Sequence, residues 1–87
     1  MEWQRQIRAL AKKVIPRALE TSGSMDLQDI YSVVSAASNG LCDDSIPCQH
    51  EKLSSPRPEW QHIVRSALDH LKRKGVVRRV PPKWALA

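Results

Sequence analysis

Hydrophobic residues recur every three to four positions in three stretches of the chain, the spacing of an amphipathic α-helix. The first apolar stripe begins at Trp3, and Pro16 predicts the end of this helix, or a kink in it, because proline lacks the amide donor that a helix needs. Ser22–Gly23–Ser24 then predicts a loop. The stripe comprises Trp3, Ile7, Leu10, Ala11, Val14 and Ile15.

A second helix is predicted to begin at Asp26, a good N-cap residue, with Asp29 suited to its positive end. Asn39–Gly40 predicts its C-terminal stop, since glycine adopts the left-handed conformation that closes a helix. Residues 41–55 have no clear period, and we expect an extended loop with room for one helical turn. The expected buried face comprises Leu27, Ile30, Tyr31, Val33, Val34 and Ala37.

The third helix, residues 58–74, has the clearest pattern. Pro58 suits the first helical position, which makes Arg57 the N-cap, and Gly75 stands where the residue after the C-cap is expected. Its apolar face comprises Trp60, Ile63, Val64, Ala67, Leu68 and Leu71.

After Gly75 the period changes to that of β-strands. Strands are predicted at Val76–Val80 and Trp84–Leu86, joined by Pro81–Pro82–Lys83, because prolines cannot donate to a ladder and belong in the connection. The predicted fold is therefore mainly α with a C-terminal β-hairpin. Three helices followed by a hairpin are the plan of a winged helix-turn-helix, the hairpin being the wing.

Length and composition agree with this predicted fold and limit the class of protein. The 87 residues form one small domain, residues 1–87, and a hydrophobic content of 41% suffices for a core built on Trp3, Trp60 and Trp84 in the absence of Phe. The sequence contains no run of 18 apolar residues that could span a membrane, and two cysteines do not make a disulfide scaffold. Because Arg5 and Arg8 interrupt the apolar residues near Met1, we expect no signal peptide. We expect a cytoplasmic protein of a bacterial cytosol.

The net charge of +5 is unevenly placed. Residues 1–19 carry a net +4, residues 20–56 a net −5 and residues 57–87 a net +6. A basic module usually meets nucleic acid or another acidic surface. Four basic residues of the first helix would either contact a DNA backbone or only solvate the helix: Arg5, Arg8, Lys12 and Lys13.

A helical wheel of residues 58–74 places a polar face opposite the apolar one. Arg65 and Arg73 suit bidentate contacts to bases or phosphates, and His62 lies where recognition helices approach bases. Asp69 is four residues from each arginine, and we expect it to orient one of them rather than accept from a cytosine amino group. The predicted DNA-contacting residues of the helix and hairpin are Arg57, Gln61, His62, Arg65, Ser66, Asp69, Lys72, Arg73, Arg78, Arg79 and Lys83.

The stretch PEWQHIVRSALDHLKRKGVV, residues 58–77, resembles the N-terminal winged-helix domain of Mrr-like restriction endonucleases, which shows V-R-x-A-L-x-x-L-K-x-x-G and then a strand. Leu27–Tyr31 is similar to that group's second helix, and Trp84–Leu86 to its closing strand. The family's wing turns through a glycine, whereas this chain has Pro81–Pro82–Lys83, which implies a shorter and stiffer wing. The loop with two cysteines is also outside the family pattern.

The resemblance implies a module that targets a nuclease to foreign or modified DNA, including DNA with 5-methylcytosine, within restriction-modification systems. It further implies that the chain is the N-terminal module of a longer protein, with the nuclease domain in cis. Arg65 matches the recognition helix, and Arg78 and Arg79 match the basic strand of the wing.

The sequence gives weaker evidence for a metal site or a catalytic site than for DNA binding. Cys42, Cys48 and His50 have residue types that zinc favours, but there is no C-x-x-C pair and no clear fourth ligand. No phosphate-binding glycine loop, nuclease motif or Ser/His/Asp set is present, so we expect no cofactor and no catalysis by this domain. The alternatives to a reader of double-stranded DNA are a protein-interaction or dimerisation winged helix and a zinc-stapled enzyme fragment.

Overall fold

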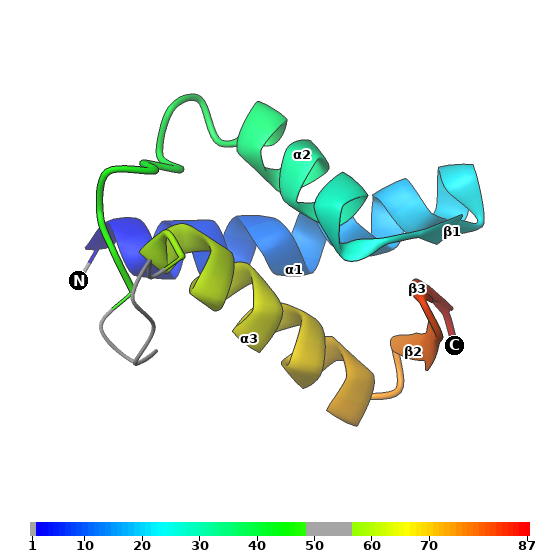
Figure 1. Ribbon diagram of the computed structural model, residues 1–87. Helices are drawn as coiled ribbons and strands as arrows, with labels where there is room; N and C mark the ends of the chain where they lie inside the picture. The colour runs from blue at the N-terminus through cyan, green and yellow to red at the C-terminus, as the bar shows by residue number, and fades with distance from the viewer. Residues whose placement is uncertain (1, 49–56) are drawn as a thin grey trace.

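A computed structural model describes residues 2–48 and 57–87 of the chain. Three helices and a small antiparallel sheet are present in these residues, and α1 lies across α2 and α3 while the sheet closes one end (Figure 1). The protein is therefore mainly helical with strands at its C-terminal end. The elements are α1 (Glu2–Ser22), β1 (Ser24–Met25), α2 (Leu27–Ala37), α3 (Glu59–Arg73), β2 (Val77–Val80) and β3 (Lys83–Leu86).

The first helix is longer than predicted, because α1 continues through Pro16 to Ser22. Proline inside a helix costs about 3 kcal/mol, and burial of Leu19, which follows Pro16, offsets about 1.5–3 kcal/mol of that cost. Leu19 is buried on the same stripe as Ile7 and Ile15. The predicted end of the helix at Pro16 is therefore wrong, with burial as the reason, and the alternative of a kink at Pro16 stays a prediction.

The segment predicted as the loop Ser22–Gly23–Ser24 is instead a tight connection. Ser22 is the last residue of α1, and Gly23 has a φ of 82°, the left-handed conformation that closes a helix. The Gly23 amide donates to the Leu19 carbonyl at 2.8 Å. Ser24 then begins β1, a strand that the sequence pattern does not predict.

The second helix begins as predicted: Asp26 is the N-cap of α2, and its carboxylate accepts from the Asp29 amide at 2.8 Å. Asn39 and Gly40 follow the helix with positive φ, which confirms the predicted stop. Ile30, Tyr31 and Val34 are buried, whereas Leu27 and Val33 are only partly buried. Ala37 is exposed and does not belong to the buried face, which follows Ile30, Val34 and Ser38 at four-residue spacing.

The loop after α2 is held against the start of α3. Residues 41–48 contain turns but no helical turn, and the rest of the predicted loop, residues 49–55, lies outside the described residues. The Glu59 amide donates to the Ile46 carbonyl at 2.8 Å, and the Cys48 amide donates to the Arg57 carbonyl at 2.8 Å. Trp60 Nε1 donates to the Asp44 carboxylate at 2.7 Å.

The third helix confirms the predicted periodicity, since all six apolar residues of the predicted face are buried. Its start is shifted by one residue: Pro58, not Arg57, is the N-cap, because its extended ψ of 143° ends the loop and Glu59 is the first helical residue. At the other end Gly75 has a φ of 77°. The Val76 amide donates to the Leu71 carbonyl at 2.9 Å, a bond typical of a Schellman C-cap.

The sheet has the strand order β1-β3-β2, with both pairs antiparallel. β2 and β3 form the predicted hairpin, in which Arg79 pairs with Trp84. Its bounds differ by one residue from the prediction: Lys83, expected in the connection, pairs with Val80 as the first residue of β3, and Val76 precedes β2 because its amide caps α3. Met25 of β1 also pairs with Trp84. One face of the sheet packs on the helices, and the tryptophans confirm their core role, with Trp60 buried and Trp3 and Trp84 packed against the cluster.

We expect Asp44→Ala to lower the free energy of unfolding by about 1–3 kcal/mol, because the substitution leaves the part-buried Trp60 Nε1 without its acceptor. Asp44→Asn keeps a side-chain oxygen and should cost less. Urea denaturation followed by tryptophan fluorescence measures both variants. Equal losses would show that the hydrogen bond is not what secures the loop.

Candidate nucleic-acid interface

The outer face of α3, defined by His62, Ser66, Asp69 and Arg73, is turned away from the core. Asp69 and Arg73 are exposed, and His62 and Ser66 are half-buried. An Arg73 guanidinium nitrogen lies 2.9 Å from Asp69 Oδ2, which confirms that Asp69 orients an arginine one helical turn away. The two side chains are 72% and 60% exposed, so this pair adds little stability and leaves Arg73 accessible.

Arg65 does not share the exposure of Asp69 and Arg73. It is half-buried and lies on the side of α3 that faces the sheet. A helical wheel treats the helix as isolated and therefore does not show that the hairpin covers this side. Arg65 instead lines a cavity of about 230 Å³ between α3, the start of α2 and the hairpin, whose lining comprises Leu27, Arg65, Leu68, Asp69, Arg79, Pro82 and Trp84.

The basic residues of the hairpin divide between two faces, because neighbouring residues of a strand point to opposite sides. The Arg79 guanidinium carbon lies 5.3 Å from the centre of the Trp84 ring, a cation–π distance, on the side that faces α3. Arg78 pairs with Ala85 and lies on the opposite side of the sheet. Arg78 and Lys83 are exposed.

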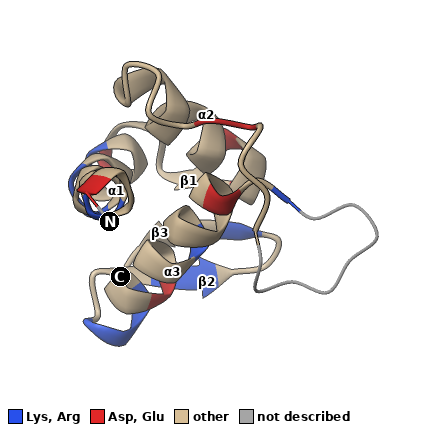
Figure 2. Cartoon of the chain, turned by 90° about the vertical axis from the view of Figure 1, so that its left-hand side faces the viewer, with Lys and Arg blue, Asp and Glu red and all other residues tan. Residues whose placement is uncertain are grey.

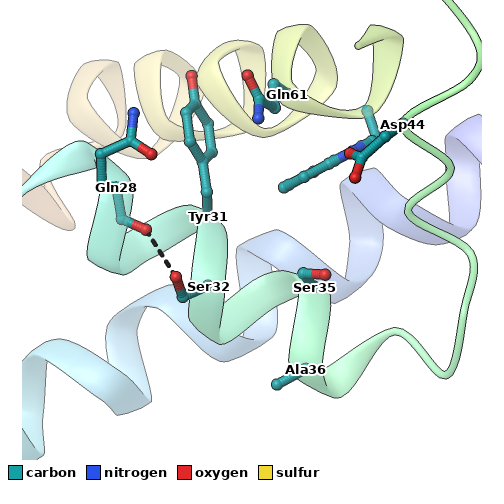
Figure 3. Close-up of a pocket in the computed structure, with 8 residues that line it drawn as sticks. Gln28, Tyr31, Ser32, Ser35, Ala36, Asp44 and Gln61 are labelled. Atoms are coloured by element: carbon teal, nitrogen blue, oxygen red, sulfur yellow. Dashed lines mark hydrogen bonds between the residues drawn. The ribbon is translucent and has the colours of Figure 1, made fainter.

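Gln61 lines a second, polar cavity of about 460 Å³ between α2 and the start of α3 (Figure 3). Its side chain projects from α3 toward α2, where Gln28 lies on the facing helix. The Tyr31 and Trp60 rings meet edge to face at a centroid distance of 5.5 Å in its floor. Asp44 and Gln28 are polar groups of this cavity that the sequence pattern did not single out.

The two remaining residues predicted to contact DNA, Lys72 and Arg57, lie near the two ends of α3. Lys72 is exposed near the C-terminal end of α3. Arg57 is exposed just before α3, and its carbonyl accepts the Cys48 amide. Among the predicted residues, Gln61 and Arg65 are half-buried where they line cavities, whereas Arg79 lines a cavity and is exposed.

A further basic surface, the α1–α3 basic face, is defined by Arg8, Lys12, His70 and Lys74. Lys and Arg residues lie along α1, at the C-terminal end of α3 and on β2 (Figure 2). Lys12 lowers the pKa of His70 most, followed by partial desolvation and then Lys74, Arg73 and Arg8. Two helices far apart in the sequence therefore place their cations side by side.

Two acidic residues of the loop after α2 have structural roles. Asp43 accepts from the Ser45 amide at 2.9 Å and from the Ser45 hydroxyl at 2.6 Å, and these bonds hold its pKa below the usual range. Asp43 therefore caps the turn at Ser45, and Asp44 is the acceptor of Trp60.

The cysteines are free thiols, Cys48 buried and Cys42 half-buried. Burial is the main cause that raises the pKa of Cys42, and Asp44 adds to it. Within residues 2–48 and 57–87, no group of three His, Cys, Asp or Glu side chains could hold a metal ion. His50, the third residue of the candidate zinc arrangement, lies outside these ranges.

None of the described helices combines the length and apolar character needed to cross a membrane. Comparison with known proteins provides no relative, because no family model, curated protein or solved structure matches the chain. The residues and their geometry therefore carry the functional argument.

We expect Lys12→Gln to raise the pKa of His70, because Lys12 is the largest cause that lowers it. Lys13→Gln is the matched control, since this neighbouring lysine is exposed on another side of α1 and should leave the pKa of His70 in place. NMR titration of the His70 ring protons measures both. A similar shift in both variants would indicate the field of the whole protein rather than a local contact.

Proposed function

We propose that this chain is a winged helix-turn-helix module that binds duplex DNA, with α3 in the major groove and the β2–β3 hairpin against the sugar–phosphate backbone. The order of three helices and a hairpin, and the return of β3 to pair with β1, support this arrangement. No catalytic role is proposed for the domain itself.

The observation that carries the proposal is the accessible outer face of α3 beside a hairpin with exposed basic residues. An α-helix with its side chains is about 10–12 Å across, and the major groove of B-DNA is about 12 Å wide. The apolar side of α3 is fully engaged in the core, so its outer face is the side free to enter a groove.

Each group has a chemical role in this arrangement. Arg73 and His62 can donate to base edges, and Arg78 and Lys83 can donate to phosphates. Gln61, together with Gln28 across the polar cavity, offers the amide groups that read adenine when they reach its edge.

Arg65 and Arg79 have a different role in this proposal. Because both line the cavity between α3 and the hairpin, they fix the hairpin relative to the helix. Arg79 is exposed but its guanidinium lies over the Trp84 ring, whereas Arg78, also exposed, lies on the other side of the strand and is the phosphate donor of β2 in this arrangement.

The biological role we propose is the targeting of a restriction endonuclease, joined to this module in cis, to foreign or modified DNA. This role rests on the resemblance of residues 58–77 to the winged-helix domain of Mrr-like enzymes. The exposed outer face of α3 supports it, because that face is where a modified base in the major groove would be met.

We expect the protein to bind a duplex with an affinity that falls about ten-fold or more between 50 and 200 mM salt, because each phosphate contact releases counterions. Arg78→Gln combined with Lys83→Gln should make the slope of log K against log salt shallower by about 1.8. Fluorescence anisotropy with a labelled duplex measures both. Absence of binding at low salt would contradict the proposal and favour a protein-interaction winged helix.

We expect one modified duplex to bind more tightly than the unmodified one in a panel of duplexes of the same sequence. The panel contains 5-methylcytosine, 5-hydroxymethylcytosine, N6-methyladenine and phosphorothioate duplexes, and a single good base contact provides about 1–3 kcal/mol of discrimination. Competition binding ranks them. Equal affinities across the panel would leave DNA binding in place and contradict the modification-reading role.

A further inference from the structure

We propose that the α1–α3 basic face binds phosphates of the DNA strand across the major groove from the hairpin. This inference rests on the proposed function, which places α3 in that groove. It assigns α1 a direct role in binding and gives each strand of the duplex its own basic contact surface.

The first step of the argument is geometric. A helix that lies in a major groove has a sugar–phosphate backbone on each of its two sides, so tight binding favours cations on both. The hairpin lies beside one side of α3, the side that carries Arg65 and Leu68. His70 lies on another side, where Lys12 and Arg8 of α1 approach it.

The packing of α1 fixes these cations in place. Ile7 and Ala11 are completely buried in the common core, so the residues that follow each of them, Arg8 and Lys12, lie at the rim of the contact between α1 and α3. One helical turn separates Arg8 from Lys12, which places them in a row on one side of α1. The row ends beside the last turn of α3.

The charges of this face are not compensated within the part of the chain that the structure describes. There, Arg8, Lys12 and Lys74 have no carboxylate within ion-pair distance, and the exposed Asp69 is engaged with Arg73. His70 faces Lys12 and Arg8 from α1 and Lys74 and Arg73 from its own helix, and its lowered pKa reports their combined field. A phosphate at this face would relieve the repulsion.

Several acidic residues lie away from this face: Asp29 is on α2, and Asp43 and Asp44 are in the loop after it. The carboxylates on the helices of the face itself are Glu2 and Glu20, near the two ends of α1, and Glu59 and Asp69 of α3. Complementary charge steers a ligand toward the surface of opposite sign and away from the like-charged one. A DNA strand is therefore guided to the side formed by α1 and α3.

The decisive experiment compares two double variants of α1. Arg8→Gln with Lys12→Gln removes one Arg and one Lys from the α1–α3 basic face. Lys13→Gln with Arg17→Gln removes the same charges from the opposite, exposed side of the same helix. The affinity of each for one duplex is measured across a salt series, and thermal unfolding checks that both variants are folded.

We expect the first double variant to make the slope of log K against log salt shallower by about 1.8, and the second to change it little. Equal changes in the two variants, or none in either, with wild-type binding intact, would overturn this inference alone. Absence of binding by the wild-type protein would overturn the proposed function as well.

A second measurement needs no substitution. NMR titration of wild-type His70, free and in the complex, should show a higher pKa in the complex, because phosphates offset the cations that lower it. The matched readout is His62 on the outer face of α3, which reports contact by the helix itself. A pKa of His70 that is the same in both states would overturn the placement of phosphates at this face.

Discussion

The fold depends on the burial of one stripe of α1. Ile7, Ala11, Ile15 and Leu19 are spaced four residues apart and are at most 2% exposed, so α1 supplies a continuous apolar edge against which α2, α3 and the sheet pack. Within residues 2–48 and 57–87, the buried hydrophobic residues apart from Cys48 form a single cluster around this stripe. The continuation of α1 through Pro16 is part of this constraint, because Leu19 is buried only if the helix goes on.

The same continuation positions the hairpin. Because α1 ends at Ser22 and Gly23 reverses the chain at once, β1 runs back beside β3 and Met25 pairs with Trp84. Trp84 in turn pairs with Arg79 of β2 and lines the cavity that Arg65 enters from α3. A break in α1 at Pro16 would therefore displace the hairpin relative to α3, although the two are not neighbours of Pro16 in the sequence.

Local patterns sufficed for the elements whose signals lie within one stretch of chain. The period of α3, the Asp26 N-cap and the Gly75 C-terminus were predicted and are confirmed. Features that depend on tertiary contacts were not predicted from the sequence. β1 has two residues, too few for a pattern, and its strand character comes from β3. Arg65 was placed on the outer face because a wheel omits the sheet, and His70 was passed over because Lys12 lies on another helix.

The repulsion of protonated His70 by Lys12 and Arg8 lowers the stability of the free protein in acid, whereas the same cations favour the binding of phosphate in the proposed complex. Folding alone gains nothing from cations at the rim of the α1–α3 contact, since lowering the pKa of His70 means that its protonation opposes the folded state. With the folded pKa below the usual value of 6.5, stability falls as the pH drops through that value and into the lower pKa of the folded form. A bound phosphate would offset this positive field, so the arrangement that weakens the free protein in acid favours the proposed complex.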